Sequence, residues 1–140
     1  MPIRCEIVDQ DRIVFQGEAD MVLLPGADGE MGILPNHAPV LTVLQLGVIR
    51  VRLKGEEQYF TVSGGVVEVQ PDQVTVLADA AENVAEIDIQ RAEQARKRAE
   101  ESLKEGVGKD PDTYLKIQAA LKRSNLRLDA ARRFRESRRP

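Results

Sequence analysis

The chain has 140 residues, of which 42 % are hydrophobic and 31 % are charged, and its formal net charge is −3. This composition excludes a disordered chain and is typical of a globular protein of one domain, or of one domain with an appendage. The sequence has no apolar run long enough to span a membrane and no signal-peptide core at its N-terminus, so we expect the protein to stay in the compartment where it is made.

The first part of the chain has the pattern of short strands separated by turns. In residues 48–54, VIRVRLK, apolar residues alternate with three cations, which predicts a strand with one buried and one exposed face. Similar runs recur about every eight to twelve residues, the spacing of an antiparallel sandwich or barrel. Cys5 lies in the first of these runs. Because it is the only cysteine, it forms no internal disulfide, and we expect it to be a small buried hydrophobe.

Residues 66–79, VVEVQPDQVTVLAD, predict a β-hairpin. Pro71 presets the backbone of the second position of a turn, and Asp72 favours the third. We expect the β-sandwich to end near Asp79.

The chain then changes in charge and composition. Residues 1–84 carry a net charge of −8, whereas residues 85–140 carry +5. Ala, Glu, Gln, Lys and Arg replace the β-branched residues and favour helix. Asp88 is placed to cap a first helix, and small residues recur behind it at helical spacing: Ala92, Ala95, Ala99 and Leu103.

A second helix is predicted after the two glycines of EGVGKDPDTY, residues 105–114, with Asp110 as its cap and Pro111 as its first residue. Its stripe is Tyr114, Ile117, Leu121, Ser124, Leu128 and Ala131. We therefore divide the chain into a β-sandwich, residues 1–84, and an antiparallel helical hairpin, residues 85–140. Because alanine buries little apolar area, the hairpin should dock only weakly, and we hypothesise that residues 86–140 are a mobile regulatory element.

No catalytic or metal constellation is indicated. His37 is the only histidine, and no serine, cysteine or acidic residue is placed near it in the sequence as a triad partner. The glycines of GADGEMG lack the Lys-Ser/Thr of a phosphate-binding loop, and Asp28 and Glu30 read as turn residues. We expect a protein that is not an enzyme.

The arginines of the hairpin admit two interpretations. Arg91 and Arg98 share one face of the first helix and Arg123 and Arg127 one face of the second, so all four could converge on a phosphate group. They could instead form a solvated face paired with neighbouring glutamates. Residues 122–139 hold eight Lys/Arg and two Asp/Glu, which suits an acidic partner or nucleic acid, although the few aromatics disfavour single strands.

Three segments, GEMGILPNHAPVLT, SGGVVEVQPDQVTVLADAAE and IDIQRA, precede this basic hairpin and together resemble the epsilon subunit of bacterial F-type ATP synthases. The resemblance covers essentially the whole chain. It implies an α+β fold, in which an antiparallel sandwich of about ten strands precedes the helical hairpin. It also implies a peripheral rotor subunit on the cytoplasmic face of the bacterial membrane, bound to the gamma subunit and the c-subunit ring. In that family the hairpin folds down on the sandwich or extends along gamma, and the extended form blocks ATP hydrolysis.

The resemblance further implies ATP as a regulatory ligand, with no metal predicted. The family motif I/L-D-x-x-R-A is present as Ile87, Asp88, Arg91 and Ala92, and the other matching positions are Glu82, Arg98, Arg123 and Arg127. Glu30 and His37 lie in the loop that resembles the partner-contact region, and the basic last helix would meet an acidic stretch of the catalytic beta subunits. The glycine-bearing connection EGVGKDP departs from the family pattern. The alternative is a stand-alone ATP-sensing or nucleic-acid-binding module that uses the basic hairpin.

Overall fold

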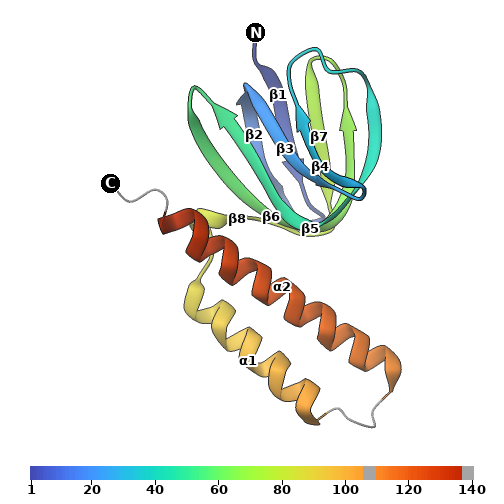
Figure 1. Ribbon diagram of the computed structural model, residues 1–140, viewed down its shortest axis with the longest axis vertical. Coiled ribbons are helices and arrows are strands. Elements are labelled where there is room, and N and C mark those ends of the chain that lie inside the picture. Colours follow the sequence, from blue (N-terminus) through green and yellow to red (C-terminus); the bar gives the residue numbers. More distant parts are fainter. Residues whose placement is uncertain (106–109, 137–140) are drawn as a thin grey trace. The chain divides into compact units, whose positions relative to one another are not determined.

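Eight strands and two helices form within the part of the chain that the structure describes, residues 1–105 and 110–136 (Figure 1). The structure is a computed structural model, and it divides into two units, Met1–Val84 and Ala85–Pro140. The sheet followed by paired helices confirms the predicted α+β fold. The strands are β1 (Ile3–Val8), β2 (Ile13–Ala19), β3 (Met21–Gly26), β4 (Gly29–Ile33), β5 (Val40–Leu53), β6 (Glu56–Val69), β7 (Gln73–Ala78) and β8 (Ala81–Asn83). A 3₁₀ turn, η1 (Val84–Glu86), precedes the helices α1 (Ile89–Glu105) and α2 (Pro111–Glu136).

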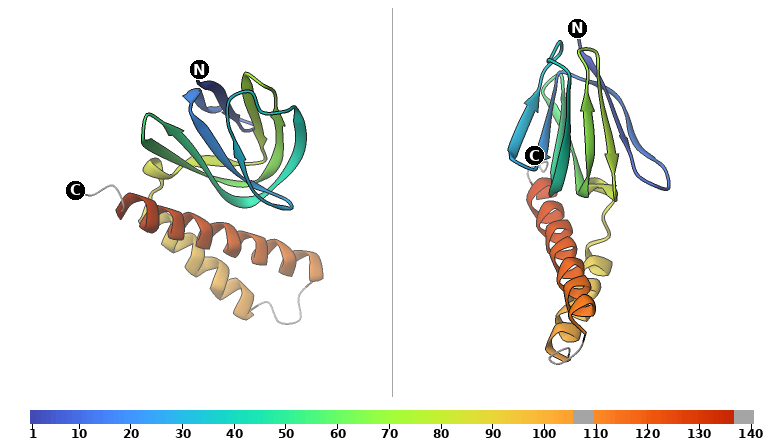
Figure 2. Two further views of the ribbon diagram at one scale, coloured as in Figure 1. Left: turned by 45° about the horizontal axis from the view of Figure 1, so that its top comes forward. Right: turned by 90° about the vertical axis from the view of Figure 1, so that its right-hand side faces the viewer.

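The strands follow the order β2-β1-β7-β6-β5-β3-β4, with β8 paired to β6. The 14-residue strands β5 and β6 pair in register along their whole length, and β6 bends at Gly64 and Gly65, whose φ angles are 119° and 137°. One half of this pair joins β7 and the other half joins β3 and β8, so the same two strands serve both layers of the sandwich (Figure 2). Counting each long strand as two accounts for the predicted number of about ten.

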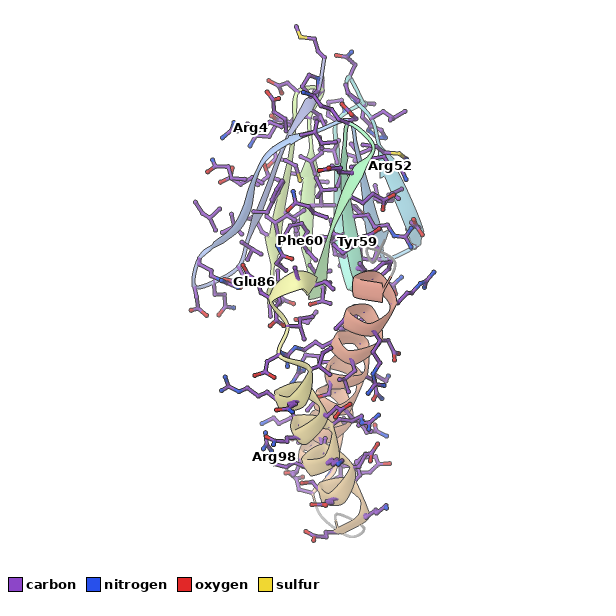
Figure 3. The ribbon with its side chains drawn as sticks, turned by 90° about the vertical axis from the view of Figure 1, so that its left-hand side faces the viewer. Arg4, Arg52, Tyr59, Phe60, Glu86 and Arg98 are labelled. Atoms are coloured by element: carbon purple, nitrogen blue, oxygen red, sulfur yellow. The ribbon has the colours of Figure 1, made fainter. Side chains whose placement is uncertain are left out.

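The core of the first unit lies between these layers. Phe60 is fully buried, and its ring packs against that of Phe15 with centroids 5.3 Å apart. Its neighbour Tyr59 lies on the opposite side of β6, as strand alternation requires (Figure 3). Cys5 is buried as predicted, and this burial raises the pKa of its thiol from 9.0 to about 12. The side chain is therefore an unreactive part of the core.

The hairpin predicted around Pro71 is confirmed, but the strands continue past Asp79, where they were expected to end, and stop at Asn83, inside the predicted boundary at residue 84. Gln70 and Gln73 exchange backbone hydrogen bonds of 2.8 and 3.3 Å across the turn between β6 and β7. Beyond Asp79 the chain forms one more strand, β8, which pairs antiparallel with residues 60–62 of β6. Its sequence, Ala-Glu-Asn, has low strand propensity and is too short to show alternation. Pairing with β6, rather than local preference, therefore makes it a strand.

The second unit is an antiparallel helical hairpin in which α1 packs against α2 (Figure 1). Most of the predicted seam is buried or half-buried, but Tyr114 is exposed because it lies in the first turn of α2. The two glycines predicted to separate the helices, Gly106 and Gly108, lie outside the described residues. Within the described ranges, neither helix combines the length and apolar character needed to cross a membrane.

Candidate functional site

Asp88 caps the N-terminus of α1, as the sequence predicts. Its Oδ1 accepts a hydrogen bond from the backbone N–H of Arg91 at 3.1 Å, and its carbonyl oxygen accepts one from the N–H of Ala92 at 3.0 Å. The carboxylate satisfies a donor that has no partner within the first turn and complements the positive end of the helix dipole. The capping role is confirmed, and a contact with ATP stays a prediction.

An ion pair joins the two helices. Nη2 of Arg132 donates to Oε1 of Glu93 across 2.5 Å. Glu93 lies near the start of α1 and Arg132 near the end of α2, so the pair fixes how the antiparallel helices are aligned. Because both helices rise about 1.5 Å per residue, the residue five positions after Glu93 lies level with the residue five positions before Arg132. These two residues are Arg98 and Arg127.

The same ion pair shows that the four predicted arginines lie on one side of the hairpin. Successive helix residues are rotated by about 100°, so Arg91 and Arg98 lie roughly 140–160° around α1 from the glutamate of the pair. Arg123 and Arg127 lie roughly 140–180° around α2 from the arginine of the pair. All four therefore lie on the side of the hairpin opposite the ion pair. Arg123 is one helical turn from Arg127, and Arg91 is two turns from Arg98. We call them the arginine side.

The arginine side has the chemistry of a polyphosphate site. Arg91, Arg98 and Arg123 are exposed and Arg127 is half-buried; Arg98 projects outward from α1 in Figure 3. Guanidinium groups donate paired N–H bonds that match phosphate oxygens. The glutamates Glu93 and Glu100 lie on the opposite side of α1, so neither of these carboxylates is placed among the four cations.

The remaining predicted ATP residues occupy different environments. Glu82 lies in β8, opposite Thr61 of β6, and is half-buried. Ile87 and Ala92 are buried, with exposed fractions of 2 % and 0 %. Ala92 lies on the face of α1 that carries the buried Ala99. The parts of these three residues in binding ATP stay predictions.

The predicted partner residues Glu30 and His37 lie at β4 and in the loop that follows it. Glu30 is exposed near the start of the strand. Nδ1 of His37 donates to the carbonyl oxygen of Ala38 at 2.7 Å, which holds the ring against its own loop. The preceding Asn36 has a φ of 67° and donates its backbone N–H to the carbonyl of Pro71 at 2.8 Å. This loop is therefore anchored to the turn between β6 and β7, and its partner role stays a prediction.

A row of apolar side chains that the sequence reasoning missed crosses five neighbouring strands on the outer face of the sheet. Each member lies directly opposite the next in the strand register, so the side chains share one face. Val8 is half-buried and the others are 37–57 % exposed. Contiguous exposed apolar surface marks an interaction site. This apolar row consists of Ile13 (β2), Val8 (β1), Leu77 (β7), Val66 (β6) and Val43 (β5).

A signal for the apolar row was present in the sequence. Val66-Val67 and Val76-Leu77-Ala78 are consecutive apolar residues within strands, and consecutive residues face opposite sides of a sheet. Apolar residues on both sides indicate that both faces of the strand are covered. The strand order, which brings the outward members of the runs into one line, was needed to see the row.

Family models match both units of the chain. The beta-sandwich domain of the ATP synthase delta/epsilon chain matches residues 2–84, and the long alpha-helix domain of the same chain matches residues 85–132. Curated relatives named ATP synthase epsilon chain include that of Dehalococcoides mccartyi, 44 % identical over 96 % of this chain and 95 % of the relative. The epsilon chain of Moorella thermoacetica is 46 % identical over 92 % of this chain and 96 % of its own length.

Solved structures show the same fold. A chain in the mitochondrial ATP synthase of Euglena gracilis, described as OSCP/F1/c-ring, has a TM-score of 0.76 and 23 % identity, covering 93 % of this chain and 81 % of that one. A chain in the central stalk/c-ring of the Tetrahymena thermophila mitochondrial enzyme has a TM-score of 0.60 and 15 % identity, covering 92 % of this chain and 96 % of that one. The architecture is thus retained at low sequence identity.

Proposed function

Because the chain belongs to the ATP synthase delta/epsilon family, we propose that it is a non-catalytic rotor subunit of the central stalk that restrains ATP hydrolysis. In this role the sandwich binds the gamma subunit and the c-subunit ring, and the hairpin alternates between a compact and an extended state. The extended state is inhibitory, with the basic α2 against an acidic stretch of the beta subunits. ATP favours the compact state.

The arginine side is the observation that carries the proposed regulation. Arg98 and Arg127 lie at one level on facing helices, so a single phosphate chain can be held by both helices at once. A ligand that needs both helices stabilises the closed hairpin by RT ln(1 + [L]/Kd), about 2.7 kcal/mol at a hundredfold excess over Kd. When ATP is scarce this stabilisation is lost and the helices are released.

The apolar row supports the rotor role of the sandwich. The neighbouring row on the same face contains Glu68, Thr75 and Glu6 beside the exposed Leu41, so polar groups line most of one side of the apolar row. An apolar centre with a polar border is typical of a protein–protein interface. We assign the apolar row to gamma, and the anchored loop with Glu30 and His37 to contacts with the c-subunit ring.

Calorimetry on the purified chain tests the ligand. ATP should bind to the chain, and its affinity is compared with and without magnesium. Arg91→Ala and Arg127→Ala should each weaken ATP binding. Unchanged affinity in both variants would show that the arginine side does not bind the phosphates. Arg133→Ala is the matched control: Arg133 is exposed in α2, and it points away from α1 because it lies about 140° around the helix from the buried seam residue Leu128. It is also rotated by roughly 80° from Arg123 and 120° from Arg127.

Hydrogen exchange and assembly test the switch. ATP should slow amide exchange in α1 and α2, while without ATP these helices should exchange faster than β5 and β6. Equal protection of both units without nucleotide contradicts a mobile hairpin. In the assembled enzyme, removal of residues 86–140 should raise ATP hydrolysis, and gel filtration with gamma should give a stable complex.

A further inference from the structure

The ion pair between Glu93 and Arg132 closes the open end of the hairpin. The chain joins the helices after Glu105 and before Pro111, whereas the pair lies at the other end, five residues into α1 and five from the end of α2. An interaction far from the connection opposes separation of the helices most directly. We call this pair the clasp.

The clasp places one α1 carboxylate beside a strongly cationic segment. Residues 122–139 hold eight Lys/Arg against two Asp/Glu. Arg133, next to the clasp, has its guanidinium 5.3 Å from the centroid of the Phe134 ring. Once the helices separate, Arg132 loses Glu93, and another carboxylate is the group that replaces it best.

We propose that Arg132 is a contact for an acidic polypeptide partner, and that Glu93 occupies this contact in the closed hairpin as an internal competitor. The partner opens the clasp by exchanging its own carboxylate for that of Glu93. The side chains of Arg132 and Glu93 are 48 % and 37 % exposed, so water and competing anions reach the pair and its hold is modest. The inference rests on the proposed function, because that function requires the hairpin to open.

A short polyglutamate peptide is the probe, and its binding to the full chain is measured by fluorescence anisotropy at low and physiological salt. Glu93→Gln keeps the shape of the side chain and should bind the peptide about twofold to fivefold more tightly than wild type, the range expected for an exposed ion pair. Glu100→Gln is the matched control. It removes the same charge from the same side of α1, but Glu100 lies 4.0 Å from Arg96 within its own helix.

Arg132→Gln tests whether Arg132 is the group for which Glu93 and the peptide compete. This variant should bind the peptide more weakly, and adding Glu93→Gln to it should give no further change. Equal effects of Glu93→Gln and Glu100→Gln overturn the proposal, because the gain would then reflect net charge alone. So does a gain that persists without Arg132, or a preference for duplex DNA over the peptide. Circular dichroism of each variant confirms that the helices have formed.

The two proposals fail differently. Neither clasp residue belongs to the arginine side, so ATP binding should survive Glu93→Gln. Loss of ATP or gamma binding in the wild-type chain refutes the proposed function, whereas the peptide series alone decides the clasp.

Discussion

Val66 of β6 lies directly opposite Leu77 of β7, and both side chains are exposed although their strand neighbours Val67 and Val76 are fully buried. At this position the two strands are therefore apolar on both faces. The inner-face residues Val67 and Val76 are buried in the hydrophobic core. The outer face has apolar surface that a second protein can cover, which is why we assign it to an interface.

Replacing both exposed residues with threonine should weaken the complex with gamma. Val66→Thr with Leu77→Thr keeps side chains suited to a strand but removes apolar area, and we expect roughly a tenfold rise in Kd. The unfolding midpoint should change little because neither side chain belongs to the core. Sedimentation or gel filtration with purified gamma measures the effect.

Leu34→Thr is the control for this pair. Leu34 is 55 % exposed, but it follows β4 and lies outside the apolar row. If its effect on gamma binding equals that of the double substitution, the row is not the interface.

Substitution of Asp88 should separate capping from ligand binding. Asp88→Ala should destabilise the first turn of α1 by about 1 kcal/mol, whereas Asp88→Asn should cost only a few tenths because an amide oxygen also accepts the Arg91 N–H. Exchange of the Arg91 amide measures this difference. If Asp88→Asn leaves that amide protected yet weakens ATP binding, the carboxylate charge acts on the ligand. Equal loss of protection in both variants contradicts the capping argument.

The sequence predicted those features of the structure that are set by residues close together in the chain. The cap at Asp88, the turn at Pro71 and the burial of Cys5 follow from side-chain chemistry within a few residues, and all three are confirmed. The strand β8 and the apolar row depend on which strands become neighbours, and one sequence does not contain that pairing. The arginine spacing predicted a shared face on each helix, but the clasp was needed to place both faces on one side.

The ion pair between Arg52 and Glu57 predicts a dependence of stability on pH. Nη2 of Arg52 donates to Oε1 of Glu57 at 2.9 Å, and this bond, with a smaller contribution from Tyr59, lowers the pKa of Glu57 below 4.5. A carboxylate with a lowered pKa in the folded state stabilises the fold above the unfolded pKa, and that stabilisation is lost as pH falls through the folded value.

Glu57→Gln should therefore differ from wild type only where the carboxylate is ionised. At neutral pH we expect a loss of less than about 1 kcal/mol in the free energy of unfolding, because the pair is partly exposed. The difference should shrink as pH falls from the unfolded pKa through the folded pKa, as measured by urea unfolding. Arg52→Gln completes a double-mutant cycle. In the Arg52→Gln background, the effect of Glu57→Gln on the free energy of unfolding should depend much less on pH. An undiminished dependence there assigns it to another group.

Removal of Arg96 should stabilise the closed hairpin. Within the described part of the chain the Nε of Arg96 is buried without a hydrogen-bond partner, and Oε1 of Glu100 lies 4.0 Å from it. A buried donor left unsatisfied costs roughly 1–3 kcal/mol, and the 30 % exposure of this side chain points to the lower end of that range. Arg96→Met keeps the apolar stem and removes the donor, so amide exchange in α1 should slow by about fivefold. Arg98→Met, on the exposed arginine side, should bring no such gain. If both variants protect α1 equally, general helix propensity explains the effect; if Arg96→Met speeds exchange, the arginine is a stabilising part of the seam.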